Sequence, residues 1–139
     1  MPNLVAFTDG ACRGGNPGMC SSAFVVYKDG TEYHKQGRVL EGTHSNNESE
    51  YQALLDLLDF LYANSLRNVI VYSDSELVCK QVNQVYRTES DELRLLMVKA
   101  YGLLTRGCHV LKHVKGHSGI EGNEAADKLC NEVLDATKI

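Results

Sequence analysis

The sequence predicts an α/β fold, in which helices flank a mixed five-stranded sheet. Residues 4–8 are apolar or β-forming without polar alternation, which is typical of a strand buried on both faces. Asp29-Gly30 separates two strand-like segments and predicts a tight hairpin. Hairpin-linked strands followed by alternating helices and strands indicate a mixed sheet.

The chain divides into nine expected elements in the order strand, strand, strand, helix, strand, helix, helix, strand, helix. The strands are expected at residues 4–8, 21–28, 31–40, 68–73 and 108–114, and the helices at 45–63, 75–84, 90–105 and 122–136. The third strand is polar, as expected at a sheet edge. An apolar stripe supports the first helix, formed by Tyr51, Leu54, Leu55, Leu58 and Leu61.

Local signals fix the expected ends of two helices. Ser45 with Glu48 fits a capping box at the start of the first helix. Arg106-Gly107 should end the third, with Gly107 as the glycine beyond the last turn.

The composition indicates a single domain over residues 1–139, with 43% apolar residues and no segment long enough to span a membrane. The first strand begins almost at once and leaves no room for a signal peptide. Five dispersed cysteines without C-x-x-C spacing suggest free thiols in a reducing compartment. We therefore expect a cytoplasmic, monomeric protein.

The net charge is −4, which argues against a simple electrostatic nucleic-acid binder. That argument weakens if some of the acids hold metal ions. Four carboxylates around two divalent cations would be neutral together, and the remainder of the chain would then be neutral as well.

Four acids lie at places where they could meet. Asp9 follows the first strand and Asp74 follows the fourth. Crossover rules place these strands parallel and adjacent, so their carboxyl ends share one edge of the sheet. Glu50 lies on the apolar side of the first helix, and Asp127 lies in the last helix. For Asp9 alone, a turn aspartate is an equally good interpretation.

Clustered carboxylates repel one another unless they are protonated or bind a metal. Oxygen ligands select hard cations, here Mg²⁺ with Mn²⁺ as a substitute. Two such ions can activate a water and stabilise the leaving oxygen in phosphodiester cleavage. His117, in a glycine-containing loop, could move protons, although a solvated loop histidine is the alternative.

Four segments resemble ribonuclease H of type 1, in the order of that family: TDGACRGGNPG at 8–18, SNNESEY at 45–51, SDSELV at 73–78 and VKGHSGIEGNEAADKL at 114–129. The resemblance implies the RNase H-like fold and Mg²⁺-dependent cleavage of the RNA strand in RNA–DNA hybrids. It also implies that Asp9, Glu50, Asp74 and Asp127 are the metal ligands and catalytic acids, with two bound ions. His117 resembles the catalytic loop histidine of the family.

The same resemblance suggests substrate contacts. Hydroxyl and amide groups suit the 2′-hydroxyls of the RNA strand. Ser45 stands where the family has a threonine that touches a DNA phosphate, and Glu76 replaces a common glutamine near the substrate. The expected contacts are Cys12, Asn16, Ser45, Asn46, Asn47 and Glu76.

Some features depart from the family. The loop with Arg13-Gly14-Gly15 is one residue longer, and the basic, tryptophan-rich insertion that some members have after the second helix is missing. Tyr86 and Arg87 stand there instead, so we expect weak, salt-sensitive binding of the hybrid. Two alternatives remain open: a DNA nuclease of the integrase or resolvase kind, and an inactive nucleic-acid-binding module.

Overall fold

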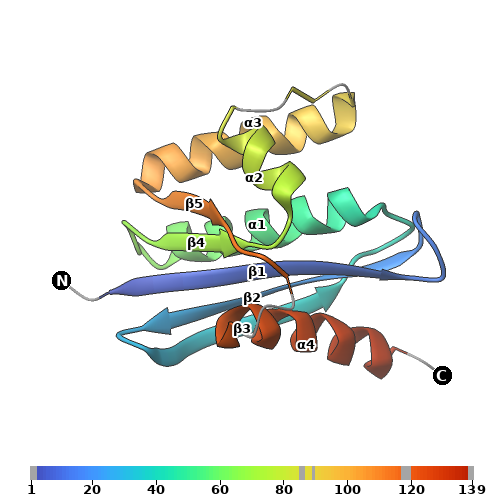
Figure 1. Ribbon diagram of the computed structural model, residues 1–139, viewed down its shortest axis with the longest axis horizontal. Helices are drawn as coiled ribbons and strands as arrows, with labels where there is room; N and C mark the ends of the chain where they lie inside the picture. Colours follow the sequence, from blue (N-terminus) through green and yellow to red (C-terminus); the bar gives the residue numbers. More distant parts are fainter. Residues whose placement is uncertain (1–2, 85–86, 89, 117–119, 138–139) are drawn as a thin grey trace.

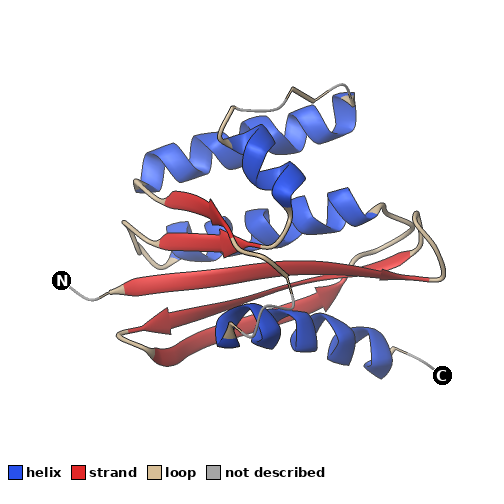
Figure 2. Cartoon of the chain, in the orientation of Figure 1, coloured by secondary structure: helices blue, strands red, loops and turns tan. Residues whose placement is uncertain are grey.

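The structure is a computed structural model that describes residues 3–84, 87–88, 90–116 and 120–137. One five-stranded sheet, in the order β3-β2-β1-β4-β5, has helices on both faces (Figure 1, Figure 2). The predicted fold class and element order are confirmed. In chain order the elements are β1 (Leu4–Arg13), β2 (Met19–Lys28), β3 (Thr31–Val39), α1 (Asn46–Ala63), β4 (Ile70–Ser73), α2 (Glu76–Val82), α3 (Asp91–Gly107), β5 (Val110–His113) and α4 (Glu121–Ala136).

The pairing of the strands is mixed, as predicted. β1, β2 and β3 form an antiparallel meander, whereas β1 with β4 and β4 with β5 are parallel. Lys28 pairs with Thr31, so Asp29 and Gly30 form the two-residue turn between β2 and β3. The parallel pairing of β1 with β4 ends at Thr8 and Ser73, although β1 itself continues to Arg13.

The two faces of the sheet carry separate apolar layers. Successive side chains of a strand point to opposite faces. On β1, Ala6 joins the main core with α1, α2 and α3, while Phe7 joins a smaller cluster with Ala126 of α4. All five residues of the predicted apolar stripe of α1 are buried. Asp9, two residues after Phe7, therefore shares the α4 face.

Three predictions of local structure need correction. Asp9 does not end the first strand, because β1 pairs with β2 as far as Arg13 and Met19. The left-handed residue after α3 is Cys108 (φ 58°) rather than Gly107, which is the last helical residue. Cys12 and Cys20 form a disulfide, so only Cys79, Cys108 and Cys130 are free thiols. The disulfide forms because the extended pairing of β1 with β2 places Cys12 directly opposite Cys20.

The helices also bear on whether a membrane span is present. Over the part of the chain that the structure describes, no helix combines the length and the apolar character needed to cross a bilayer.

Candidate active site

Three carboxylates from different elements meet beyond the end of β4. Asp9 lies in β1, Asp74 follows β4, and Glu50 lies in the second turn of α1. One carboxylate oxygen from each residue lies within 4.8 Å of the other two. Three acids that are far apart in the chain are thus brought together, as the strand order predicts.

Asp127 approaches Asp9 from the α4 face of the sheet, whereas Glu50 approaches from the α1 face. Asp127 lies on α4, and its proximity contributes to raising the pKa of Asp9, but it is not one of the three acids whose oxygens lie within 4.8 Å of one another. The Cys130 thiol, one turn further along α4, donates to the Asp9 carbonyl at 3.2 Å. The Ser21 hydroxyl donates to the Cys130 carbonyl at 2.9 Å, which fixes α4 against β2 as well.

Two glycines let the helices approach β1 closely enough for this meeting. A Cβ atom on Gly10 would lie 2.5 Å from Ser49 Oγ and 2.7 Å from the Glu50 nitrogen of α1. A Cβ atom on Gly122 would lie 2.1 Å from the Phe7 ring, so α4 could not pack at its present distance. These two glycines are positioning residues that our sequence interpretation overlooked. The signal for Gly10 was its place directly after a candidate ligand.

The electrostatics of the cluster are unfavourable for negative charge. Burial raises the pKa of Asp9 to about 9, and the charges of Asp74 and Asp127 add to this effect. The Gly10 N–H, which donates to Asp9 Oδ1 at 2.9 Å, offsets it only in part. Burial, followed by the charges of Asp9 and Asp74, also raises the pKa of Glu50 well above its usual range.

The cluster also contains buried acceptors without a protein donor. Glu50 Oε1 and Asp74 Oδ1 are buried and have no hydrogen-bond partner within the described ranges. Such atoms are costly unless something satisfies them. A donor set made only of carboxylate oxygens fits Mg²⁺ or Mn²⁺, and a cation there would remove both the repulsion and the unsatisfied acceptors. The residues present therefore fit a hard divalent cation.

His117 and Tyr86 lie outside the described residues. Gly116, the last described residue before His117, packs against Asp74, since a Cβ atom on it would lie 3.2 Å from Asp74 Oδ2. Arg87, the other residue expected to replace the missing insertion, is exposed.

Most of the expected substrate contacts gather where the β1–β2 loop meets the start of α1. We call residues 12–20 and 44–49 the loop–helix junction. The Asn46 N–H donates to Asn16 Oδ1 at 2.9 Å, and Gly18 and His44 exchange two backbone hydrogen bonds. Asn47 is exposed on the first turn of α1. Glu76 lies outside this junction, exposed at the start of α2, where it pairs with Lys80 at 3.9 Å.

The capping box predicted for α1 is confirmed and belongs to the same junction. Ser45 Oγ accepts from the Glu48 N–H at 3.1 Å, and Glu48 Oε1 accepts from the Ser45 N–H at 3.0 Å. The backbone hydrogen bond from Ser45 is the main reason that the pKa of Glu48 is lowered. Glu48 is thus occupied by the helix end, which leaves Glu50 as the acid of α1 at the carboxylate cluster.

Comparison with known proteins places these features in a family. The chain matches the RNase H family over residues 1–135. It is 29% identical to the ribonuclease H of Francisella philomiragia, covering 95% of this chain and 91% of the relative. The crystal structure of RNase H1 from Halobacterium salinarum is 34% identical with a TM-score of 0.88, covering 97% of this chain and 99% of that one.

A further solved structure contains a substrate. LC11-RNase H1, crystallised in complex with an RNA/DNA hybrid, is 29% identical with a TM-score of 0.83 over 96% of this chain and 98% of that one. The match spans the whole sheet and all four elements that supply or position the acids. The chain therefore belongs to the ribonuclease H family, in its type 1 branch.

Proposed function

We propose that this protein hydrolyses the RNA strand of RNA–DNA hybrids, with two Mg²⁺ ions held by Asp9, Glu50, Asp74 and Asp127. The observation that carries the proposal is the cluster of Asp9, Glu50 and Asp74, whose carboxylate oxygens lie within 4.8 Å of one another and include buried acceptors without a described donor. The hybrid bound in the LC11-RNase H1 structure supports the choice of substrate.

The four acids and the loop–helix junction would have different roles. The ions, when bound, would supply an activated water and stabilise the leaving oxygen of the cleaved bond. The four acids would be deprotonated and would hold the ions at the edge of the sheet beyond Ser73. The loop–helix junction would bind the backbone of the hybrid, with Ser45 and Asn46 at the positive end of α1.

His117 and Glu76 have roles in the proposal that rest on the resemblance. We propose that His117 moves a proton at the reacting phosphate. Glu76 adds a negative charge beside the substrate and so weakens binding of the hybrid. We also propose that the enzyme acts as a single monomeric domain.

A substrate panel tests the proposal. An RNA–DNA hybrid, duplex DNA and duplex RNA of one sequence are incubated with Mg²⁺, Mn²⁺ or a chelator. We expect cleavage of the RNA strand of the hybrid alone, with either ion, and none with the chelator. Cleavage of duplex DNA would favour the integrase-like alternative, and hybrid cleavage that survives the chelator would contradict the metal mechanism.

A further inference from the structure

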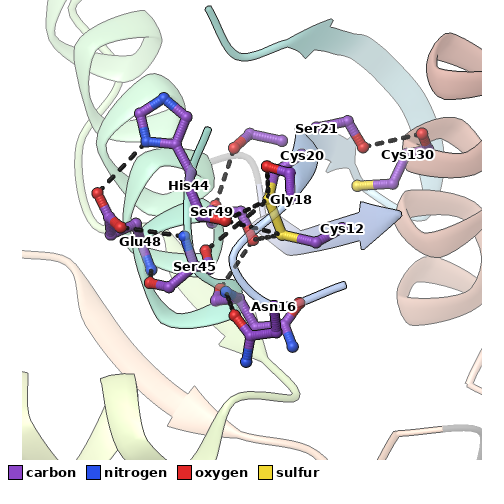
Figure 3. The surroundings of a disulfide bond; sticks show 12 residues. Cys12, Asn16, Gly18, Cys20, Ser21, His44, Ser45, Glu48, Ser49 and Cys130 are labelled. Carbon is purple, nitrogen blue, oxygen red and sulfur yellow. Dashed lines mark hydrogen bonds and ion pairs between the residues drawn. A yellow bond between two sulfur atoms is a disulfide. The ribbon is translucent and has the colours of Figure 1, made fainter. Parts of the chain in front are cut away.

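The disulfide between Cys12 and Cys20 lies inside the loop–helix junction (Figure 3). We propose that it is a site of thiol–disulfide exchange, at which a dithiol in the surroundings sets how tightly the enzyme binds its hybrid. This inference rests on the proposed function, because it concerns a residue expected to touch the substrate.

The register of the sheet brings the two cysteines together. Cys12 on β1 and Cys20 on β2 are direct cross-strand partners, and their Cα atoms lie 4.0 Å apart. Side chains of such a pair point to the same face of the sheet. The disulfide therefore closes the β1–β2 loop at its base, and the loop carries Asn16.

The surroundings of the disulfide are the surfaces expected to bind substrate. Cys12 Sγ lies 3.8 Å from Ser49 Oγ and 3.8 Å from the His44 carbonyl, both beside the capped end of α1. Asn16 accepts the Asn46 N–H from the same helix end. Figure 3 shows Cys12, Asn16, Ser45 and Ser49 gathered around the disulfide. A change at the sulfur atoms thus acts directly on the candidate contacts.

The two cysteines differ in exposure, which sets the order of the reaction. Cys20 is fully buried, whereas Cys12 is partly exposed. A thiolate of the dithiol attacks Cys12 Sγ, a mixed disulfide forms, and the Cys12–Cys20 bond breaks. Cys20 leaves as a thiolate and takes up a proton. Its S–H can then donate to the His44 carbonyl, which lies 3.1 Å away.

A second exchange completes the reduction. The second thiol of the reductant attacks the reductant sulfur that is bonded to Cys12, so Cys12 leaves as a thiolate and takes up a proton. Two electrons and two protons pass from the dithiol to the protein, and the reductant becomes a disulfide. The reaction runs in reverse with an oxidised dithiol, so the ratio of oxidised to reduced dithiol sets the fraction of protein that carries the disulfide.

Reduction gives Cys12 a donor that the disulfide lacks. A thiol can donate to a 2′-hydroxyl of the RNA strand, and the opened loop can adjust to the hybrid. We expect the dithiol enzyme to bind the hybrid about fivefold more tightly, which corresponds to one recovered hydrogen bond. By linkage, the hybrid should shift the exchange equilibrium toward the dithiol by the same factor.

The test uses the whole protein equilibrated with reduced or oxidised dithiothreitol. Alkylation and mass spectrometry count the thiols, with five expected in the reduced protein and three in the oxidised one. Steady-state cleavage then gives KM and kcat, and fluorescence anisotropy of a labelled hybrid in chelator gives Kd. We expect KM and Kd to be about fivefold lower after reduction with kcat unchanged.

Two variants separate this site from general thiol effects. Cys20→Ser cannot form the disulfide, and its hydroxyl can still donate to the His44 carbonyl, so its KM should be low under both conditions. Cys20→Ala serves the same purpose if the serine variant does not fold. Cys108→Ser, which removes an exposed free thiol between α3 and β5, should respond to dithiothreitol like the wild type.

The outcomes distinguish the two proposals. Equal KM and Kd in both redox states, or a Cys20→Ser enzyme that still responds to dithiothreitol, would overturn the exchange site. If neither state cleaves the hybrid, the proposed function fails, and the two Kd values still decide whether the disulfide controls binding.

Discussion

The carboxylate cluster and the loop–helix junction lie next to each other, yet they satisfy their polar groups in opposite ways. In the cluster, buried oxygens of Glu50 and Asp74 have no described donor, and the pKa values of Asp9 and Glu50 are raised. In the junction, Ser45, Glu48 and Asn16 bond to neighbouring backbone groups. The cluster therefore needs a ligand to be satisfied, whereas the junction is satisfied by the protein itself.

This difference predicts what each region contributes. A change in the cluster should affect chemistry with little loss of stability, because repulsive carboxylates do not hold the fold together. A change in the junction should affect stability and substrate binding and leave the chemical step alone, because its hydrogen bonds fix the start of α1.

The largest expected effect is that of Asp9→Asn. We expect kcat to fall at least about 100-fold, because this variant removes a proposed metal ligand. Loss of a residue that only orients a metal ligand typically lowers activity by about 10–100-fold, and loss of the ligand itself should lower it further. The free energy of unfolding of the metal-free protein should stay the same or rise, because the raised pKa of Asp9 means that folding at pH 7 requires its carboxyl to take up a proton, and an amide does not. Cleavage assays and urea unfolding measure the two effects.

Asp59→Asn is the matched control, because it removes one exposed acid of α1 away from the cluster. Its activity should equal that of the wild type. An Asp9→Asn enzyme with undiminished Mg²⁺-dependent cleavage would show that the cluster is not the active site.

Gly10→Ala should have an intermediate effect, since it disturbs the contact between the two regions. The added Cβ would approach the Ser49 carbonyl carbon at 2.6 Å and the Glu50 nitrogen at 2.7 Å, which are backbone atoms that cannot move independently of α1. We expect a loss of about 1–3 kcal/mol in stability and a drop in kcat of roughly tenfold or more from a displaced Glu50.

Gly102→Ala is the control for this substitution. Gly102 lies within α3 with open space around it, so alanine should stabilise the protein by about 0.5–1 kcal/mol and leave activity unchanged. If Gly10→Ala retains full activity and stability, close packing of α1 on β1 does not position Glu50.

The smallest effect is expected for Ser45→Ala. Loss of the cap should lower the free energy of unfolding by about 1 kcal/mol and raise KM for the hybrid with little change in kcat. Ser90→Ala removes the equivalent cap of α3, in which Ser90 Oγ accepts from the Leu93 N–H outside the junction. Both variants should lose similar stability, and only Ser45→Ala should change KM; a KM shift in both would contradict a binding role for Ser45.

The sequence was sufficient for the fold and for the meeting of the strand-borne acids. Strand order and handedness place Asp9 beside Asp74, and helix periodicity turns Glu50 inward. These are consequences of backbone pairing and apolar patterning, which residue types reveal directly.

The extent of β1 was not predictable in the same way. Gly10 to Arg13 lack large apolar side chains, but their backbones pair with residues 19–22 of β2. Backbone pairing does not need apolar side chains, so the end of the apolar run was taken as the end of the strand. That error hid the register that joins Cys12 to Cys20. The close approaches at Gly10 and Gly122 likewise depend on tertiary packing that a single sequence does not display.

The most direct test of the central claim is calorimetric titration of the metal-free protein with Mg²⁺ at pH 7, in buffers of different ionisation enthalpy. Because the pKa of Asp9 is raised to about 9, its carboxyl holds a proton at pH 7 and must release it to bind a cation. We predict saturable Mg²⁺ binding with release of about one proton or more, and a smaller release in Asp9→Asn. Absence of saturable binding, or binding without any proton released, would contradict the account.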